Sequence, residues 1–371
     1  MLVKEELREG NIRIPAGCAI SGIFSKNGTK INGRLIVDSI AVMRDRSNGL
    51  GGGFAGYGIY PEYKDSYALH VFFDDNGPRE ETERFINSHF DVENLSRIPV
   101  RNNPGITDSP LIWRYFVSPL KSKLEENQLD EKEYVARCVI KINTAIKGAY
   151  VFSSGKDMGV FKAVGYPEDV GDFYRLEEYS GHCWTAHGRY PTNTPGWWGG
   201  AHPFSLLDYS IVHNGEISSY DANRRYVEMF GYKCALLTDT EVITYIFDLL
   251  NRRHGMSLTD IASTVAAPFW NEIDKMEPAE KEKMTAIRNV YSSLLITGPF
   301  SIILGFEGGM MALNDRLKLR SMVAAEKDDY VMAASEECAI RAIFPEVDRI
   351  WSPKGGEPVI ATLNGGVDNG D

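Results

Sequence analysis

The stretch NIRIPAGCAISGIFSKNG (residues 11–28) places Cys18 where a compact turn becomes an apolar, strand-like run. Ala16, Gly17 and Ala19 are small and leave room around the sulfur. An accessible thiol at the end of a strand is typical of a nucleophile, which also needs a base and an oxyanion site. The alternative is a buried cysteine that acts as a small hydrophobic side chain. This stretch alone leaves both interpretations open.

The composition limits the class of protein. The chain has 371 residues, 43% hydrophobic and 25% charged, as in ordinary globular proteins. Its net charge of −11 argues against nucleic acid as a partner. The longest apolar stretch, residues 293–306, is interrupted by glycine and proline and is too short to span a membrane. Residues 1–17 lack the apolar centre of a signal peptide, so we expect a cytoplasmic protein without membrane contact.

The five cysteines are dispersed along the chain and form no CxxC pair. This spacing predicts neither a structural zinc site nor an iron–sulfur cluster, and we expect no metal or cofactor in this chain. A disulfide framework is also not expected. The cysteines are Cys18, Cys138, Cys183, Cys234 and Cys338.

The order of the predicted elements indicates the fold class. Strands come in runs, with helices between them, which differs from the regular alternation of a doubly wound fold. We therefore expect an α+β protein with antiparallel sheets, formed as a single domain over residues 18–371 with an elaboration around residues 61–180. Thr238 and Glu241 fit a capping box at the start of a helix. The clearest predicted helices cover residues 34–47, 78–90, 124–146, 238–253 and 278–295; the clearest strands lie within residues 68–75, 181–190, 206–217, 300–314 and 328–337.

A second segment with chemical potential is HGRYPTNTPGWWGGAHPFS, residues 187–205. It holds Arg189 beside Pro191 and Thr192, among residues that form rigid turns. An arginine held in this way suits bidentate recognition of a carboxylate. The alternative is an aromatic, glycine-rich surface loop.

Two further segments place polar groups at the ends of regular elements. In IVHNGEIS (211–218), the side-chain amide of Asn214 and the backbone N–H of Gly215 can point to one spot, as the donors of an oxyanion hole do. The alternative is a plain hairpin turn. In LTDTEV (237–242), Asp239 offers a carboxylate to a substrate ammonium, or it only favours the dipole of the helix that begins there.

Together the four segments supply a thiol, a carboxylate binder, an oxyanion hole and an ammonium binder. These groups describe a site for the side-chain amide of glutamine. His187, His202 and His213 lie near the segments, so a histidine base stays possible. It is not required, because an α-amino group has an ordinary pKa of about 7.7 to 8.0, close to operating pH.

In this order the segments resemble the class II glutamine amidotransferases, which are N-terminal-nucleophile hydrolases. CAISGIF resembles the family's nucleophile segment, HGRYPT its H-x-R-aromatic-x-T segment, VHNGEI its H-N-G segment and TDTEV its T-D-T/S-E segment. NDRLKLR (314–320) is similar to the D-R-x-G-L-R-P turn, and AASEECAI (333–340) to the A-S-E-x-x-A segment. Ala19 stands where glycine is usual, and Lys318 and Ser321 replace the usual glycine and proline.

The resemblance implies a four-layer αββα sandwich with two antiparallel sheets. It implies that Cys18 is the nucleophile and, through its freed α-amine, the base, so residues 1–17 would be a propeptide rather than an N-terminal arm. It also implies that Asn214 and Gly215 form the oxyanion hole. The substrate-binding residues implied by the resemblance are Arg189 for the α-carboxylate, Asp239 for the α-ammonium, and Tyr190, Thr192 and His213.

Within the family, RYPTNT and HNGEI are most similar to the amidotransferase domain, or stand-alone archaeal-type subunit, of glutamate synthase. This resemblance implies glutamate biosynthesis in nitrogen assimilation. It also implies a hetero-oligomer in which a separate synthase subunit carries FMN and iron–sulfur clusters and accepts the ammonia. Three alternatives stay open: an amidotransferase subunit for another acceptor, a non-catalytic subunit that senses glutamine, and an amidase for another amide.

Overall fold

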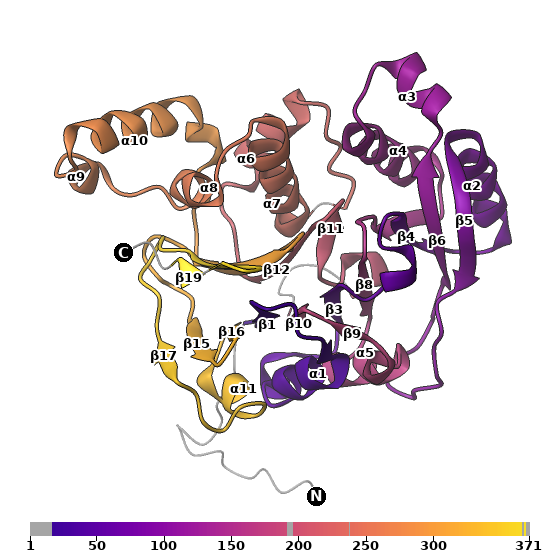
Figure 1. Cartoon of the computed structure of the whole chain (residues 1–371), viewed down its shortest axis with the longest axis horizontal. Coiled ribbons are helices and arrows are strands. Elements are labelled where there is room, and N and C mark those ends of the chain that lie inside the picture. Colours follow the sequence, from indigo (N-terminus) through magenta and orange to yellow (C-terminus); the bar gives the residue numbers. More distant parts are fainter. Residues whose placement is uncertain (1–16, 191–195, 237, 366, 369–371) are drawn as a thin grey trace, which may run out of the picture.

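The computed structural model describes residues 17–190, 196–236, 238–365 and 367–368. Two antiparallel sheets packed face to face form its centre (Figure 1). In the described residues, the larger sheet has the order β17 (Arg349–Trp351), β15 (Val323–Lys327), β16 (Tyr330–Ala334), β1 (Ala19–Ser25), β10 (Cys183–Gly188), β3 (Gly52–Tyr57) and β8 (Met158–Ala163). The smaller sheet has the order β11 (Phe204–Leu206), β12 (Tyr209–Gly215), β13 (Phe300–Phe306), β14 (Gly309–Asn314), β18 (Val359–Thr362) and β19 (Val367–Asp368).

The two sheets approach closely around β1. Every residue of β1 is buried, because one face meets the second sheet and the other meets a helix. At Gly22 a Cβ atom would lie 2.8 Å from the sulfur of Met310 on β14, so the sequence SGI in β1 fits this close approach. A strand that is buried on both faces reads as a continuous apolar run rather than an alternating one.

Helices cover both outer faces of the sheets (Figure 1). The larger sheet packs against α1 (Gly33–Ala41), α5 (Pro167–Phe173) and α11 (Glu337–Arg341). The smaller sheet packs against α7 (Asp239–Phe247), which is flanked by α6 (Tyr220–Met229) and α8 (Leu258–Val265). The predicted α+β class and the four-layer αββα sandwich are therefore confirmed.

A third sheet lies beside the sandwich, at the right of Figure 1, and is formed by the chain between β3 and β8. Its order is β5 (Phe90–Arg97), β6 (Leu111–Pro119), β4 (Tyr67–Phe73) and β7 (Ala149–Ser153), and it carries α2 (Asn76–His89), α3 (Lys121–Asn127) and α4 (Glu131–Ala145). We call residues 67–153 the inserted sheet. Within residues 61–180, β8 and α5 belong to the sandwich instead.

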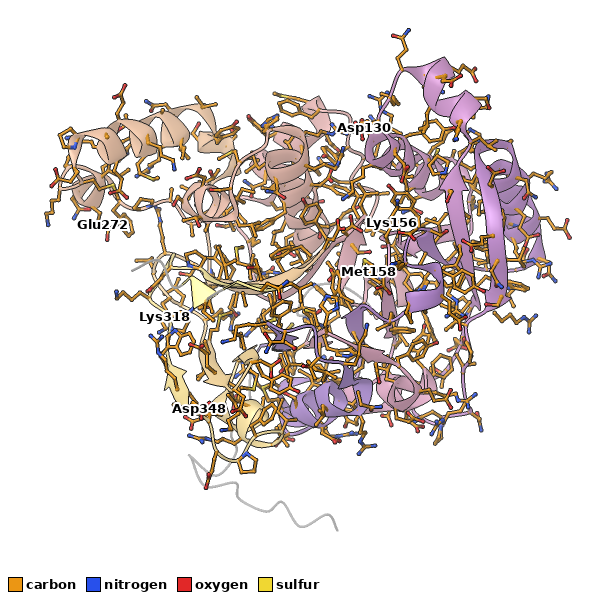
Figure 2. All side chains as sticks on the ribbon, in the orientation of Figure 1. Asp130, Lys156, Met158, Glu272, Lys318 and Asp348 are labelled. Atoms are coloured by element: carbon orange, nitrogen blue, oxygen red, sulfur yellow. The ribbon has the colours of Figure 1, made fainter. Side chains whose placement is uncertain are left out.

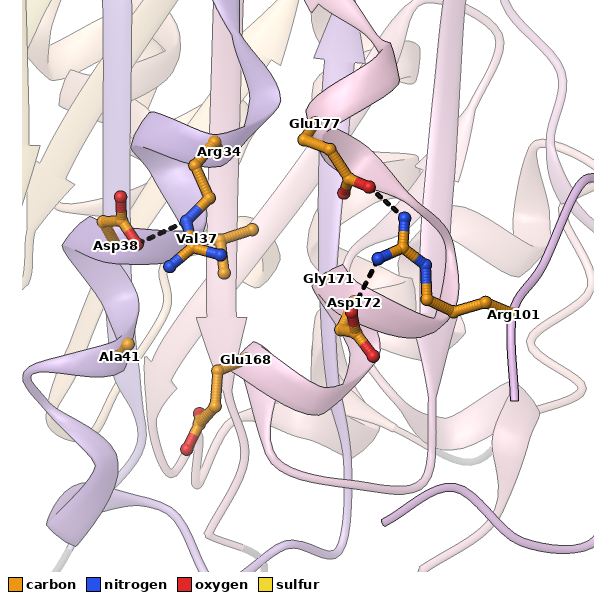
Figure 3. Close-up of a pocket in the computed structure, with 9 residues that line it drawn as sticks. All are labelled: Arg34, Val37, Asp38, Ala41, Arg101, Glu168, Gly171, Asp172 and Glu177. Atoms are coloured by element: carbon orange, nitrogen blue, oxygen red, sulfur yellow. Dashed lines mark hydrogen bonds and ion pairs between the residues drawn. The ribbon is translucent and has the colours of Figure 1, made fainter. Parts of the chain in front are cut away.

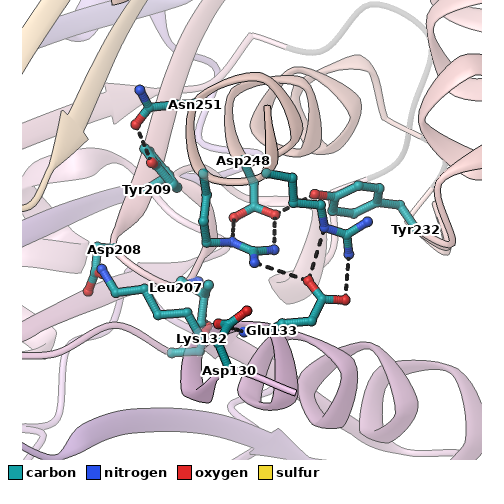
Figure 4. Close-up of polar contacts among 12 residues, drawn as sticks. Asp130, Lys132, Glu133, Leu207, Asp208, Tyr209, Tyr232, Asp248 and Asn251 are labelled. Atoms are coloured by element: carbon teal, nitrogen blue, oxygen red, sulfur yellow. Dashed lines mark hydrogen bonds and ion pairs between the residues drawn. The ribbon is translucent and has the colours of Figure 1, made fainter. Parts of the chain in front are cut away.

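The inserted sheet is fastened to the sandwich by paired charges (Figure 4). Glu133 on α4 forms ion pairs with Arg252 and Arg253, each at 3.0 Å. These arginines belong to η5 (Asp248–Arg253), a π-helical segment that continues α7. Arg252 also bonds the fully buried carboxylate of Asp248 at 2.6 Å. The helix that begins at Asp239 is therefore anchored at its far end to the inserted sheet.

Several predicted helices differ in detail from the structure. The helix expected over residues 34–47 ends at Ala41, and the one expected over 278–295 ends at Val290. The helix expected over residues 124–146 is interrupted, because Gln128 has a left-handed φ of +53° and the Asp130 side chain then caps α4. The capping box at Thr238 is wrong: Thr238 makes no side-chain cap, and Glu241 accepts from the backbone amides of Ala235 and Leu236 at 3.1 and 2.9 Å.

The remaining elements are short or peripheral. Side chains fill the interior around Met158, whereas Glu272, Lys318 and Asp348 lie at the edge of the molecule (Figure 2). No helix within the described ranges is both long and apolar enough to cross a membrane. The remaining elements are β2 (Ile31–Asn32), β9 (Ser180–Gly181), α9 (Trp270–Ile273), α10 (Pro278–Val290) and the short helices Arg44–Arg46, Pro61–Tyr63, Leu176–Glu178, Trp198–Gly200 and Ser292–Leu294.

Candidate active site

Cys18 and Arg189 meet because their strands are antiparallel neighbours. Ala19 at the start of β1 pairs with Gly188 at the end of β10, so the residues just outside this pair lie side by side. The backbone N–H of Tyr190 donates to the Cys18 sulfur at 3.3 Å. Cys18 is partly exposed at this end of the sandwich. The strand register therefore brings the predicted nucleophile to the predicted carboxylate binder.

Asn214 and Gly215 reach the same place from the second sheet, at the end of β12. A Cβ atom on Gly17 would lie 3.3 Å from the Asn214 side-chain oxygen, so this amide lies against the backbone just before Cys18. Both polar atoms of the Asn214 side chain are buried and have no hydrogen-bond partner among the described residues. Such orphaned polar groups are rare in folded proteins and call for an explanation. A bound substrate that accepts from the amide supplies one.

Gly215 cannot be replaced without moving the backbone. A Cβ atom there would collide with the carbonyl oxygen of Pro299 and lie 2.8 Å from Nε2 of His213. The sequence HNG therefore marks a close approach of two backbone segments in addition to a strand end.

Asp239 is the first residue of α7, and a polar network holds its carboxylate. The hydroxyl of Thr240 donates to Asp239 Oδ1 at 3.2 Å, and Nδ1 of His213 lies 3.6 Å from the same oxygen. Burial alone would raise the pKa of Asp239, but the His213 imidazole, the Thr240 hydroxyl and the Ile217 amide outweigh it and hold the pKa below its ordinary value. Asp239 is therefore a stable anion at neutral pH, as a binder of an ammonium must be.

Three histidines lie behind Asp239. His187 and His202 stack with ring centroids 4.1 Å apart, and His202 Nε2 lies 2.7 Å from the Thr240 hydroxyl. Burial lowers the pKa of His187 to about 3 and also lowers that of His202 well below its ordinary value. His187 Nε2 donates to the carbonyl of His213. The neutral His187 and His202 rings therefore pack behind the Thr240 hydroxyl and the His213 backbone, and neither forms a hydrogen bond with Cys18 among the described residues.

Arg189 is almost fully buried, with 7% of its surface exposed. Its backbone N–H donates to Gly51, and its guanidinium lies 3.4 Å from the carbonyl of Leu50. Burial lowers the pKa of Arg189, while the neighbouring Cys18 and Asp239 act in the opposite direction. An arginine stays charged under these conditions, so the site keeps a fixed cation for a carboxylate.

The electrostatics at the sulfur combine opposing effects. Burial raises the pKa of the Cys18 thiol above its ordinary value. The Tyr190 N–H, Arg189 and Arg320 act against this rise, whereas Asp239 adds to it. The resting thiol is therefore protonated, and a nucleophilic Cys18 needs a base that removes its proton.

The predicted site residues are placed as follows. Cys18, Arg189, Tyr190, Asn214, Gly215 and Asp239 gather at one end of the sandwich. His213 lies behind Asp239 and is 3% exposed. Thr192 lies outside the described residues. Their roles in catalysis and binding stay predictions.

Two arginines at the site were not singled out from the sequence. Nε of Arg46 donates to the Cys18 carbonyl at 3.2 Å, and its Nη1 pairs with Glu336 at 2.7 Å. Arg320 Nη1 would lie 3.0 Å from a Cβ atom on Gly17. The NDRLKLR segment drew attention to the turn that carries Arg320, but nothing in the sequence places Arg46 beside Cys18.

A hollow on the outer face between α1 and α5 is not a candidate site (Figure 3). Its arginines already have carboxylate partners: Arg34 pairs with Asp38 at 2.8 Å, and Arg101 with Asp172 at 3.1 Å. These charges neutralise one another and leave no group directed at a ligand.

Comparisons with known proteins identify the family of the chain. The family described as glutamine amidotransferases class-II matches residues 62–349, a range that contains Arg189, Asn214, Gly215 and Asp239 but begins after Cys18. The chain is 50% identical over 349 residues to a protein of Archaeoglobus fulgidus named "Uncharacterized protein", covering 93% of this chain and 92% of that one. It is 27% identical over 274 residues to the "Putative glutamine amidotransferase" of Methanothermobacter thermautotrophicus, covering 69% and 80%.

Among solved structures, the glutamine phosphoribosylpyrophosphate amidotransferase from B. subtilis matches with a TM-score of 0.47 and 13% identity, over 95% of this chain and 49% of that chain. This likeness is too distant to add to the argument. The family match covers most of the chain. The chain belongs to the class-II glutamine amidotransferases.

Proposed function

We propose that this chain hydrolyses L-glutamine to glutamate and ammonia through a thioester on Cys18. The observation that supports this most is the meeting of Cys18, Arg189, Asn214 and Asp239 at one end of the sandwich. Arg189 would hold the α-carboxylate and Asp239 the α-ammonium, which directs the side-chain amide of glutamine toward the sulfur. Membership of the glutamine-hydrolysing family supports the same substrate.

In this mechanism the α-amine of Cys18 takes the thiol proton while the sulfur attacks the amide carbon. The oxyanion is stabilised by the Asn214 side-chain amide and the Gly215 N–H. The C–N bond then breaks, and the amine gives its proton to the departing ammonia. A water molecule attacks the thioester with the amine again as base. The C–S bond breaks, the proton returns to sulfur, and glutamate leaves.

The amine can act as a base only if residues 1–17 are removed, because an amide nitrogen is not basic. Gly17 has a φ of +123°, which is accessible to glycine and strained for other residues. This conformation supports attack of the Cys18 thiol on the Gly17 carbonyl. The resulting thioester would free the amine, and hydrolysis would release residues 1–17 as a propeptide.

We further propose that the ammonia passes to a separate glutamate synthase subunit that carries FMN and iron–sulfur clusters, within a cytoplasmic hetero-oligomer. The support is the similarity of RYPTNT and HNGEI to the glutamate synthase segments. An affinity-tagged full chain, isolated from its native host, should retain a flavin-containing subunit, visible by absorbance and mass spectrometry. A different acceptor enzyme in the same eluate would overturn this partnership and leave the hydrolysis intact.

The hydrolysis itself is tested by measuring glutamate and ammonia released from glutamine by the full chain, with and without the partner. We expect equal amounts of the two products. Glutamine binding without turnover, with the partner present, would favour the sensing subunit. Turnover of another amide that free glutamine does not inhibit would favour a different amidase.

A further inference from the structure

The charged side chains around Cys18 have partners of opposite charge in the chain or in the proposed substrate, except for Arg320 among the described residues. We propose that the Arg320 guanidinium keeps the α-amine of Cys18 in its neutral, proton-accepting form once residues 1–17 have been removed. The inference rests on the proposed function, because it concerns the amine that acts as base.

The turn that carries Arg320 is held rigidly. The Asp315 carboxylate accepts from the backbone amides of Phe300, Leu317 and Leu319, at 3.0 to 3.1 Å. Lys318 adopts a left-handed φ of +54°, so the turn forms although the family's glycine is absent. The Asp315 carboxylate therefore fixes the backbone of the turn and, with it, the position from which the Arg320 side chain extends.

Arg320 is directed at the bond that processing breaks. Its Nη1 would lie 3.0 Å from a Cβ atom on Gly17, closer than the Asn214 oxygen at 3.3 Å. Its Nε is buried without a hydrogen-bond partner among the described residues. Removal of Gly17 would leave this guanidinium facing the new amine across the vacated space.

The other charges at the site have partners, either in the chain or in the substrate. Arg46 pairs with Glu336 at 2.7 Å. In the proposed pose, the carboxylate of glutamine neutralises Arg189, and its ammonium neutralises Asp239. Within the described part of the chain, no carboxylate forms an ion pair with Arg320. Among the described residues around Cys18, Arg320 is therefore a positive charge without a carboxylate partner.

A positive charge within a few ångströms disfavours a second one, so it lowers the pKa of a neighbouring amine. An ordinary α-amine, with a pKa of about 7.7 to 8.0, is mostly protonated at pH 7, and only its neutral minority can accept the thiol proton. A decrease of about one unit makes roughly half of it neutral. Burial raises the pKa of the Cys18 thiol, and Arg320 also acts against that rise. The positive charge of Arg320 therefore favours both the neutral α-amine and the thiolate of Cys18.

The test compares Arg320→Gln and Arg320→Lys with the matched control Arg316→Gln. Arg316 lies on the same turn, but its guanidinium contacts the Ala267 carbonyl and the Phe269 ring. The measurement is the pH dependence of kcat/KM for glutamine, whose acid limb reports the base of the free enzyme. We expect this limb to move up by about one pH unit in Arg320→Gln, by much less in Arg320→Lys, and not at all in Arg316→Gln.

A second measurement does not depend on activity. Chains expressed with Cys18 directly after the initiator methionine expose the amine after methionine removal, even where Arg320→Gln blocks processing. Titration of the ¹⁵N-labelled Cys18 amine by NMR should show the same upward shift in Arg320→Gln. An unchanged titration, or a loss of rate that is equal at all pH values, overturns the role of Arg320. A wild-type chain that releases no ammonia from glutamine with its partner present contradicts the proposed function instead.

Discussion

Some buried polar groups near the start of α7 lack hydrogen-bond partners in the described part of the chain, whereas the buried carboxylate at its far end has them. At its start, beside Cys18, both polar atoms of the Asn214 side chain and Nε2 of His213 are buried and lack partners among the described residues. At its far end, Asp248 is fully buried and bonds both Arg252 and the Tyr232 hydroxyl. Unpartnered buried groups cost stability, and they persist where a ligand completes them. The first end therefore fits a binding site, and the second fits a structural junction.

This comparison makes a direct claim about variants. Changes at the start of α7 and around Cys18 should alter chemistry with little effect on stability. Changes at the junction with the inserted sheet should alter stability with little effect on chemistry. Variants at the two ends of α7 should therefore separate catalysis from stability.

Cys18→Ser should lower kcat for glutamine hydrolysis by several orders of magnitude, because a serine hydroxyl is a far weaker nucleophile than a thiol with this base. The change is nearly isosteric, so urea unfolding should be unaffected. Cys338→Ser is the control, since Cys338 is an exposed free cysteine on α11. Normal turnover by Cys18→Ser would show that another group attacks the amide.

Asn214→Ala should lower kcat by about 10²–10³, the usual effect of losing one oxyanion donor. Because the Asn214 amide has no partner among the described residues, its removal should not reduce the free energy of unfolding. Steady-state kinetics and urea titration measure the two effects. A variant that is markedly destabilised but retains its kcat would reverse the comparison.

Arg189→Lys and Asp239→Asn should raise KM for glutamine about tenfold or more and change kcat less, because they hold the end of the substrate away from the reacting carbon. Lysine keeps the charge of Arg189 but loses bidentate geometry. An unchanged KM in both variants would exclude the proposed pose of glutamine.

Gly17→Ala should slow the release of residues 1–17 about tenfold, because a Cβ atom there meets Arg320 and Asn214 and the φ of +123° is strained for alanine. Gly28→Ala is the control, since its φ is also positive, at +73°, but a Cβ atom there meets only Leu363 at 3.6 Å. Mass spectrometry of freshly synthesised chains follows the release. Equal rates in both variants would remove Gly17 from the processing step.

Arg252→Met should destabilise the chain by about 3 to 5 kcal/mol, because it leaves the buried Asp248 carboxylate without its ion partner. Turnover by the folded fraction should stay within about twofold of wild type. Arg137→Gln breaks an exposed pair with the same Glu133 and should cost less than about 1 kcal/mol. A large decrease in kcat for folded Arg252→Met would show that the junction governs the chemistry.

The segments around the site could be predicted because each joins a strand end to a chemically distinctive turn. Cys18 comes just before the buried strand β1, Arg189 just after β10, and Asn214 near the end of β12. The register Ala19↔Gly188 brings the first two of these strand ends together. Arg46 and Arg320 could not be placed, because they belong to a short helix and a turn whose positions depend on tertiary contacts. The left-handed Lys318 carries no glycine signal for its turn.

The strands of the inserted sheet are harder to predict from the sequence. β5 has mostly exposed or half-buried residues, so it lacks the apolar alternation that indicates a strand. The spacing T-x-x-E predicts that the Glu241 carboxylate takes part in a capping box. The preceding loop folds back so that the amides of Ala235 and Leu236 reach it instead. Local patterns cannot anticipate a competing donor that folding brings from another segment.

The most direct test of the account is peptide mapping after inactivation by a glutamine analogue that carries an electrophilic ketone in place of the side-chain amide. Mass spectrometry identifies both the modified cysteine and the first residue of its peptide. The account predicts a single modified peptide that begins at Cys18 with a free α-amine. Modification of another cysteine, or of a Cys18 peptide that still includes Gly17 in fully active enzyme, would contradict it.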